Sequence, residues 1–524
     1  MQKIRFKLKL VQEIDGIEND MAIDIATFDK DCRRPEHIGL NVTEAKNILR
    51  NLQTNVVETQ INKAIQEHGH CNVCQAPLIR KDSRKIKYRT LYGTLDVENP
   101  RYYLCECQSE RGLSKKSVTP LSNLLSGHTA LELQYFEAKW SSLMSYGMTV
   151  DLLKDCFPVD DTLSISTTRR NTLKVAKKID ESLEEEKHIY ATPFAKADPE
   201  AFENETTVLG LDGAYIRLWS DKKTNFELIV GKSIPVLPIE KKQKPSSDQT
   251  VSKKRTRKVQ SKNIAGACLD KAGITKSVQS CKTAKVFGLV SSQDDKPKRR
   301  LYETLKSQGI KDSDGVCFLS DGGESLKKLQ TNINPNAKHI LEWFHITMKI
   351  TVLQQYIKGV TQIDSEHGAE MKKLLESIKW KLWHGKPLDA LTKILKLSDL
   401  IAAHAKDYSK FVNLIKHNSE FFNYISNNID IIVDYGKRWR SGKRISTSFT
   451  ESLVNYFISK RFCKKQQMQW SKQGAHLLVQ VRAKVVNGEL RQIFKGWYKD
   501  FDTGAADNIV FMNDVNTPTL AMAA

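Results

Sequence analysis

Four apolar runs between residues 207 and 321 constrain the fold of this chain more than any other feature. They are TVLGLDGAYIRLW, FELIVGKSIPVL, AKVFGLVSS and GVCFLSD, and KHILEWFHITMKI follows them. Short apolar runs bounded by turn residues are typical of buried strands. We therefore predict a mixed sheet over residues 205–350 with helices around it, which makes the chain a multidomain α/β protein.

Helical periodicity dominates the rest of the chain. Residues 43–68 are predicted as one amphipathic helix behind a threonine cap. Three shorter patterns at 130–144, 149–156 and 167–183 follow the rhythm of a helix-turn-helix, although a supporting helical bundle is the alternative. Almost everything from 351 to 500 is helical by period. The predicted domains are 1–67 (helical), 68–120 (zinc ribbon-like), 121–190 (helix-turn-helix), 205–350 and 441–500 (two parts of a catalytic domain), 351–440 (helical insertion) and 501–524 (tail).

The charge balance points to a polyanionic partner. The 524 residues include 82 Lys and Arg against 61 Asp and Glu, which leaves a formal net charge of +21. Nucleic acid is the first candidate, and a membrane surface is a weaker one. A basic loop at 241–262, KKQKPSSDQTVSKKRTRKVQSK, interrupts the predicted sheet and would give salt-sensitive backbone contact through Lys253, Lys254, Arg255, Arg257 and Lys258.

No apolar run approaches the roughly 20 residues of a spanning helix. The basic start MQKIRFKLKLVQEIDG lacks the apolar centre of a signal peptide. We therefore expect no membrane association and a cytoplasmic location.

Four of the ten cysteines form two close pairs. Cys71 and Cys74 bracket a tight turn in GHCNVCQAPL, and Cys105 and Cys107 follow two strand-like runs in YYLCECQSE. Two such pairs joined by a hairpin can hold structural zinc tetrahedrally. The second pair has one intervening residue, so His68 or His70 could replace one ligand, and four ordinary buried cysteines are a further alternative.

Two aspartates interrupt the strand patterns, and glycine follows each. Asp212 lies in the middle of VLGLDGAYIRLW, and Asp321 ends GVCFLSD before Gly322 and Gly323. A hairpin turn is the alternative for an Asp-Gly pair. Carboxylates on adjacent strands of one sheet would provide the oxygen ligands that magnesium prefers.

A third acid, Glu451, lies in a basic helical segment at 437–472. Ser448 and Glu451 fit a capping box, which is the structural alternative. An isolated acid in such a segment would weaken phosphate binding unless metal neutralised it. Two magnesium or manganese ions held by Asp212, Asp321 and Glu451 could support displacement at phosphorus. The predicted phosphate contacts here include Arg438, Arg440, Arg444, Arg461, Lys464 and Lys465.

From about Gly69 to Trp497 the chain resembles DDE transposases of bacterial insertion sequences, closest to the Kra type. The matching stretches are GHCNVCQAPLIRKDSRKIKYRTLYG, LDGAYIR, FLSDGGESL, KHILEWFHITMK and STSFTESLVNYFISKRFCKKQQMQWSKQGAHLLVQVRAKVVNGEL. The resemblance implies a ribonuclease H-like catalytic core, interrupted by an α-helical insertion, with Asp212, Asp321 and Glu451 as the catalytic acids. The wide intervals between these acids fit a family with insertions before the second aspartate and before the glutamate.

Further residues are accessory candidates. His345 in EWFH resembles the histidine that follows the second catalytic aspartate in several transposase superfamilies, with Glu342 in place of cysteine or aspartate; a histidine satisfied within the sheet is the alternative. Trp380 and Trp383 could stack on unpaired bases, or form the core of a helical bundle. The start of the helix at 167–183 would enter the major groove through Arg169, Arg170 and Lys174.

The sequence thus predicts a transposase that binds the terminal inverted repeats of its element, frees a 3′ hydroxyl and joins it to target DNA. Its partner would be double-stranded DNA of transposon ends and target, in the bacterial nucleoid, and the family implies a homodimer or higher oligomer on paired ends. Two rivals are a transposase-derived regulator without chemistry and a metal-dependent nuclease that does not join.

Overall fold

The computed structural model describes the chain except residues 1–2, 15–16, 19–21, 32, 110–116, 126, 184–204, 222, 236–283, 311–314, 334–336, 447, 464–468 and 505–524. The chain divides into two compact units, Met1–Ile179 with Glu489–Ala506, and Asp180–Gly488 with Asp507–Ala524. The predicted basic loop 241–262 and most of the predicted tail lie outside the described residues. No helix in the described part of the chain is both long and apolar enough to cross a bilayer.

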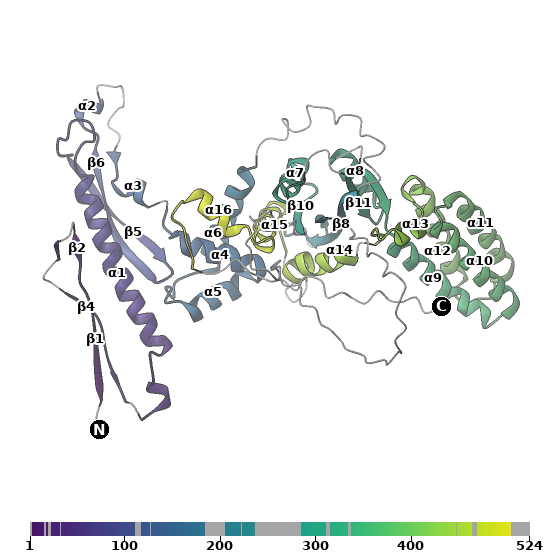
Figure 1. The fold of residues 1–524 in the computed structure, drawn as a ribbon, viewed down its shortest axis with the longest axis horizontal. Helices are drawn as coiled ribbons and strands as arrows, with labels where there is room; N and C mark the ends of the chain where they lie inside the picture. The colour runs from purple at the N-terminus through teal and green to yellow at the C-terminus, as the bar shows by residue number, and fades with distance from the viewer. Residues whose placement is uncertain are drawn as a thin grey trace, which may run out of the picture. The chain divides into compact units, whose positions relative to one another are not determined.

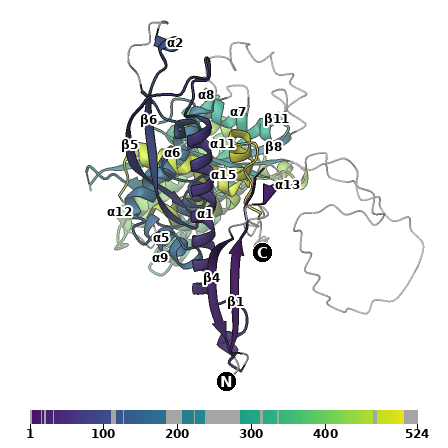
Figure 2. The ribbon, with the colours of Figure 1, turned by 90° about the vertical axis from the view of Figure 1, so that its left-hand side faces the viewer.

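The first unit opens with strands instead of the predicted helix. Its elements are β1 (Ile4–Leu10), β2 (Glu13–Ile14), β3 (Ile17–Glu18), β4 (Ile23–Lys30), η1 (Pro35–His37), α1 (Val42–Glu67), β5 (Arg80–Thr90), β6 (Gly93–Tyr103), α2 (Glu106–Ser109), β7 (Ser117–Val118), α3 (Leu121–Leu124), α4 (Leu131–Leu143), α5 (Tyr146–Cys156), α6 (Ile165–Glu181) and α16 (Leu490–Trp497). β1 and β4 pair antiparallel and form a ribbon beside α1 (Figure 2). The prediction of a helical region over 1–67 is therefore correct only for α1, because IRFKLKL alternates apolar and basic residues, which is a strand pattern.

Two cores stabilise the first unit. α1 buries Val57 and Ile61 against Leu95 and Val97 of β6, while α4 and α5 share a second cluster. α1 begins with a capping box between Asn41 and Glu44, so the cap is asparagine and not the predicted threonine. α16 follows the second unit in sequence but packs in the first unit. The ring centroid of its Phe494 lies 5.4 Å from that of Tyr135 in α4. The segment 441–500, predicted as the last part of the catalytic domain, therefore ends in a helix that belongs to the first unit.

The second unit contains the predicted mixed sheet. Its elements are β8 (Glu205–Arg217), β9 (Asn225–Pro235), β10 (Lys285–Val290), α7 (Pro297–Ser307), β11 (Gly315–Ser320), α8 (Glu324–Ile333), β12 (Lys338–Leu341), α9 (Trp343–Thr361), α10 (Ser365–Trp383), α11 (Pro387–His404), α12 (Phe411–Asn427), η4 (Ile429–Ile431), α13 (Tyr435–Arg440), α14 (Ser448–Leu453), the π-helix η5 (Val454–Cys463) and α15 (Lys472–Val486). The strand order is β10-β9-β8-β11-β12. β10, β9 and β8 are antiparallel neighbours, while β8, β11 and β12 run parallel.

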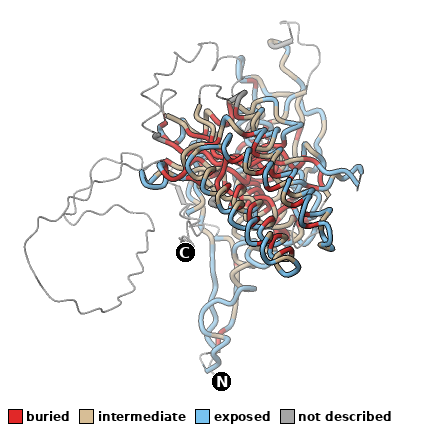
Figure 3. Tube along the Cα trace, turned by 90° about the vertical axis from the view of Figure 1, so that its right-hand side faces the viewer, coloured by how far each residue is buried: buried red, intermediate tan, exposed pale blue. Residues whose placement is uncertain are grey.

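Helices cover both faces of this sheet. α7 and α8 pack on one face, where Leu301 and Leu326 join Leu209, Leu211 and Phe318. On the other face Val208, Cys317 and Leu319 belong to a core shared with α9 to α12. Figure 1 shows α9, α10, α11 and α12 gathered as a bundle, and Figure 3 shows buried residues concentrated on the inner sides of the helices. KHILEWFHITMKI contributes a strand only over Lys338–Leu341, because α9 begins at Trp343.

Candidate functional site

The two predicted aspartates lie at the same level of two adjacent parallel strands. The ladder pairs Leu319 of β11 with Gly210 of β8. Two residues further on, Asp212 is still within β8, and Asp321 directly follows the end of β11. Because side chains alternate along a strand, both aspartates fall on the face of Leu319, toward the helical bundle and away from α7 and α8. Asp212 pairs with Val230 of β9 within the ladder, so it is a strand residue and not part of a hairpin turn.

Glu342 extends this row of acids onto a third strand. β12 pairs Ile340 with Leu319, and the Glu342 amide donates to the Ser320 carbonyl at 2.9 Å, which brings Glu342 beside Asp321. Its side chain is fully buried. The carboxylate accepts a hydrogen bond from Ser446 at 3.1 Å and lies 3.0 Å from Nδ1 of His345.

His345 stands in the first turn of α9, where Glu342 is the residue before the helix. The alternative of a histidine satisfied within the sheet is therefore wrong about its location. Its side chain is about a third exposed, at 32%. The Glu342 carboxylate orients this imidazole, and the bond joins the end of β12 to the start of α9.

The surroundings of Asp212 favour a cation. Burial, the main cause, together with the charges of Asp321 and Glu342, raises the pKa of Asp212 to about 6, although the Gly213 amide and His345 oppose the rise. The Gly213 amide donates to Asp212 Oδ1 at 2.7 Å. A carboxylate whose negative charge is disfavoured by burial and by like charges gains free energy when a cation binds nearby.

The loop after β11 is held by the helical bundle. The Asp321 carbonyl accepts a hydrogen bond from Tyr424 of α12 at 2.8 Å, and the Gly323 amide donates to Asp321 Oδ1 at 2.9 Å. Gly322 has a φ of +80°, and a Cβ there would lie 2.5 Å from Oδ1 of Asn428. Burial, with the charges of Asp321 and Glu342, strongly raises the pKa of Tyr424, which stays a neutral donor.

The helix that carries Glu451 lies next to the strand of Asp212. α14 contacts both β8 and β9, and Thr450 and Leu453 are buried in it. The side chain of Glu451 is outside the described residues, so the capping-box alternative has no structural test. The structure therefore brings Asp212 close to Asp321 and packs the helix that carries Glu451 against the strand of Asp212.

The donor set at this edge of the sheet fits a hard divalent cation. Carboxylate oxygens on β8 and β11 are the ligands that magnesium and manganese prefer. Among the described side chains, the groups with three or more possible ligand atoms close enough to share an ion are the four cysteines and Asp364, His367 and His404. Glu451 would have to complete the ligand set of the aspartates.

The four predicted cysteines form a possible zinc site. Sγ distances are 3.6 Å for Cys71 to Cys107, 3.4 Å for Cys74 to Cys105 and 3.6 Å for Cys107 to Cys74. Zinc with four sulfur ligands at about 2.3 Å separates them by about 3.8 Å, so the cluster fits the ion. Backbone amides of Cys74 and Val73 lower the pKa of Cys71 to about 6, whereas burial and the neighbouring thiols raise that of Cys107 to about 12, so without an ion the cluster favours one thiolate and zinc would have to displace the other protons.

The backbone builds the cluster without either histidine. The Cys71 amide donates to Ala76 at 2.8 Å, the Gln75 amide donates to Cys71 at 2.9 Å, and the Tyr103 amide reaches Ile79 at 2.9 Å, which brings the two cysteine pairs together. His68 instead lies 2.9 Å from the Ala64 carbonyl of its own helix. The cluster that could hold an ion comprises the four cysteines.

The third helix of the predicted helix-turn-helix exposes basic residues. α6 buries Thr168, Asn171 and Val175 and exposes Arg169, Arg170 and Lys174. Buried Glu137 of α4 accepts from Thr168 at 2.9 Å and from Asn171 at 2.8 Å, which fixes the rotation of α6. The predicted DNA-contacting side chains therefore share the outer side of this helix.

The basic segment around Glu451 divides into inner and outer residues. Arg440 and Arg444 are exposed, but Arg438 is 6% and Arg461 2% exposed. Arg438 donates to the Arg444 carbonyl at 3.0 Å, and Arg461 lies over the Trp470 ring. The prediction that these two contact phosphates is corrected, because both cations are enclosed by protein. Lys464, Lys465 and the residues from Lys253 to Lys258 lie outside the described residues.

The two tryptophans of α10 also differ. Trp383 packs on Trp343 at 5.0 Å between ring centroids, as in the bundle-core alternative. Trp380 is 48% exposed beside His384. Of these two tryptophans, Trp380 is the one whose ring is exposed and could stack on a base.

Sequence reasoning missed Tyr424 and Ser446, which bond to the Asp321 carbonyl and to Glu342, and Asn428, which donates to the Tyr424 carbonyl and fills the space next to Gly322. All are common residue types far from the aspartates in sequence. No local pattern distinguishes them, and only the return of α12 and of the segment before α14 to the sheet brings them there.

No protein-family model matches the chain, and no curated protein sequence matches it significantly.

Proposed function

We propose that this chain is a DDE-type DNA transposase of the Kra-like kind, with a ribonuclease H-like catalytic core. The observation that carries the proposal is that Asp212, within β8, and Asp321, just after β11, lie at one level of two adjacent parallel strands. α14, which carries Glu451, contacts β8 and β9. The proposal requires strand-borne aspartates and a helix-borne glutamate on one sheet.

The sheet supports the same proposal. Three antiparallel strands are followed by two parallel ones, with β8 at the centre between β9 and β11. Ligands of open α/β sheets bind beyond the carboxyl ends of parallel strands, where Asp321 stands. The α9 to α12 bundle is inserted between β12 and α14, as the resemblance implies.

The proposed reaction is displacement at phosphorus. In the first step water breaks the bond between phosphorus and the 3′ oxygen, which leaves a 3′ hydroxyl on the element. In the second that hydroxyl attacks a target phosphodiester and displaces the target's 3′ oxygen. Asp212, Asp321 and Glu451 would hold magnesium or manganese, which supplies nucleophile activation and stabilisation of the leaving oxygen when bound.

The chain's own residues provide the fixed geometry. Gly213 and Gly323 amides orient the two aspartates. Gly322 leaves room beside Asp321 for Asn428 and Leu341, which lets the loop after β11 pack against the bundle. Glu342 and His345 are positioning residues, because their bond joins the third strand to the bundle beside Asp321.

DNA binding would be shared among basic surfaces. The exposed side of α6 would enter the major groove with Arg169, Arg170 and Lys174. Arg440, Arg444 and the predicted basic loop would contact phosphates, and Trp380 would stack on a base. The four cysteines would hold structural zinc in the first unit, and two or more copies would assemble on paired ends.

The test is cleavage of a labelled duplex carrying the element's own end, with magnesium, by the full chain. Wild type should cleave and join the end. Asp212→Asn, Asp321→Asn and Glu451→Gln should bind the end and leave it intact. Asp399→Asn, an exposed acid on α11, is the matched control and should retain full activity.

The outcomes separate the rival functions. Cleavage without joined product would make the chain a nuclease. End binding without cleavage by wild type would favour a regulator. Loss of end binding in the aspartate variants would contradict the catalytic roles.

A further inference from the structure

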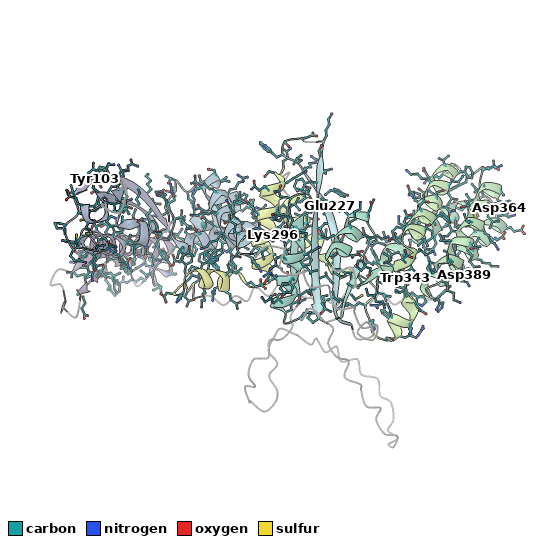
Figure 4. The ribbon with its side chains drawn as sticks, turned by 90° about the horizontal axis from the view of Figure 1, so that it is seen from above. Tyr103, Glu227, Lys296, Trp343, Asp364 and Asp389 are labelled. Atoms are coloured by element: carbon teal, nitrogen blue, oxygen red, sulfur yellow. The ribbon has the colours of Figure 1, made fainter. Side chains whose placement is uncertain are left out.

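A histidine pair and an aspartate meet at one end of the helical bundle. Asp364 precedes α10 and caps it, His367 lies in the first turn of α10, and His404 is the last residue of α11. Figure 4 labels Asp364 at the end of the bundle away from Trp343, which packs where the bundle meets the sheet. These three residues are separate from the carboxylate row and from the four cysteines, and the proposed function does not use them.

The three side chains are close enough to share one ion. Asp364 Oδ2 lies 2.7 Å from His367 Nδ1. The rings of His367 and His404 stack with centroids 3.5 Å apart and an interplanar angle of 10°. One possible ligand atom from each residue lies within 4.8 Å of the others. The fold thus brings two imidazoles and a carboxylate together, and the rings would turn out of their parallel stack to direct two nitrogens at one ion.

Tight packing holds this arrangement. Asp364 Oδ1 accepts from the His367 amide at 3.1 Å, so the helix cap also fixes the carboxylate. A Cβ on Gly368 would lie 2.5 Å from Thr361 Cα, which shows how closely the turn between α9 and α10 is packed. After His404, Ala405 is 1% exposed and anchors the end of α11 in the core.

The cluster borders a polar cavity of about 450 Å³. His404 and Asp364 line it together with the carboxylates of Glu366 and Asp407 and with Tyr408. A cation at the cluster would therefore face negative charge and could keep open positions toward the cavity. The local charge opposes an anion.

We propose that Asp364, His367 and His404 form a binding site for a divalent transition-metal ion of the zinc or nickel class. Imidazole nitrogen suits zinc, nickel and copper, whereas magnesium and calcium prefer oxygen ligands, so the donor set selects against the ions proposed for the aspartates. The ion would tie the start of α10 to the end of α11. Metal supply would thereby change the stability of the inserted bundle independently of the carboxylate row.

Nickel titration of the full chain carrying one equivalent of zinc, by isothermal calorimetry, tests this site. The single equivalent of zinc fills the four cysteines, because four thiolates bind zinc more tightly than two imidazoles and a carboxylate do, so that nickel reports on the remaining ligands. Wild type should bind one nickel ion more tightly than His404→Gln or His367→Gln by about 100-fold, because each variant loses a ligand. Asp364→Asn keeps the helix cap and should weaken nickel binding roughly tenfold, because a neutral amide oxygen replaces the charged carboxylate ligand.

His417→Gln is the matched control. His417 lies on α12 of the same bundle and also stands beside a carboxylate, 3.2 Å from Glu420, but is not in the cluster. It should bind nickel as wild type does, and nickel should raise the melting temperature of both but not that of His404→Gln. Because His404 is exposed, this variant should fold, which circular dichroism verifies. Equal nickel affinity and stoichiometry in wild type and His404→Gln would overturn the proposal.

Discussion

At the scale of single residues, the carboxyl group of Asp212 lowers the stability of the folded chain and provides a candidate metal ligand. Its pKa is raised from 3.8 to about 6 in the folded chain. An acid with a raised pKa favours the folded state below its unfolded pKa and loses that contribution as pH rises through the folded value. From about pH 4 to pH 6 the protein should therefore lose up to about 3 kcal/mol of stability from this carboxyl alone.

Asp212→Asn should remove that penalty. We expect the free energy of unfolding without magnesium to rise by up to about 3 kcal/mol at neutral pH, and to stay unchanged below pH 3.8, where the wild-type carboxyl is protonated too. Urea unfolding of wild type and Asp212→Asn across this pH range measures the difference in unfolding free energy. Magnesium should stabilise wild type and not the variant. A variant less stable than wild type at neutral pH would show that Asp212 is not strained by its surroundings.

The loop after Asp321 requires glycine at position 322. Gly322→Ala should cost about 3 kcal/mol, because alanine is strained at a φ of +80° and its Cβ would meet Asn428 and Leu341. Cleavage should fall as the loop shifts Asp321. Gly39→Ala is the control for backbone strain alone, since Gly39 has a φ of +74° with open space around it, and should cost about 1 kcal/mol. Chemical unfolding compares the two, and equal costs would exclude the proposed clash.

At the scale of elements, the outer side of α6 makes a testable DNA contact. Changing Arg169, Arg170 and Lys174 together to alanine should weaken end binding and reduce the slope of log affinity against log salt by up to about 3. Binding titrations at several salt concentrations give this slope. The matched control changes three exposed lysines of the bundle, Lys358, Lys372 and Lys373, to alanine. An equal loss in both triple variants would mean that charge alone, and not α6, determines binding.

The π-helix after α14 depends on one buried cation. Arg482 of α15, 1% exposed, donates to the carbonyls of Phe457 and Tyr456, each at 2.8 Å. Burial lowers the pKa of Arg482 to about 10, so it remains charged at neutral pH. In π-helical turns the backbone carbonyls depart from the regular α-helical hydrogen-bond pattern. Such turns are frequent at functional sites.

Arg482→Met should therefore cost roughly 2–4 kcal/mol, because two buried carbonyls lose their donor. Cleavage should fall further than stability explains, since η5 directly follows the helix of Glu451, while end binding is retained. Arg482→Lys keeps the charge with a single point donor and should be intermediate. The cleavage activity and the melting temperature of wild type, Arg482→Met and Arg482→Lys test this prediction. Full cleavage by a folded Arg482→Met variant would exclude a positioning role.

Sequence patterns predicted the strands and helices whose own residues mark which side is buried. The strands β8 to β11 are continuous apolar runs, and α6 shows its buried and charged sides in its periodicity. The site's supports could not be predicted, because Tyr424 and Ser446 reach it through tertiary contacts alone. Arg438 and Arg461 were misassigned for the same reason: a basic run suggests a solvated surface, and only packing reveals which cations are enclosed. The strands within residues 4–30 were missed although IRFKLKL alternates as a strand does, because the prediction extended the helical region of 43–68 over the residues before it.

At the scale of the whole molecule, the two units have separate cores. α1 and β6 share one cluster, α4 and α5 another, and the sheet with α9 to α12 a third, each within its own unit. Chains with independent cores unfold in more than one step. The metal sites considered for the two units differ in chemistry, a possible zinc cluster of thiolates in the first and the proposed carboxylate and histidine sites in the second, so metal ions can be used to assign the unfolding transitions.

Removal of zinc from the four cysteines should act on the first unit. With one equivalent of zinc, which fills the four cysteines, calorimetry should show two transitions, and a strong chelator should lower one of them because thiolate binding free energy contributes directly to folding. Magnesium should raise the other, and Asp321→Asn should abolish that rise. Cys74→Ser should reproduce the chelator effect, and Cys156→Ser, an exposed cysteine outside the cluster, should not. A single transition that moves with both metals would mean that the units fold as one, and that the cysteine cluster stabilises the carboxylate site through the whole chain.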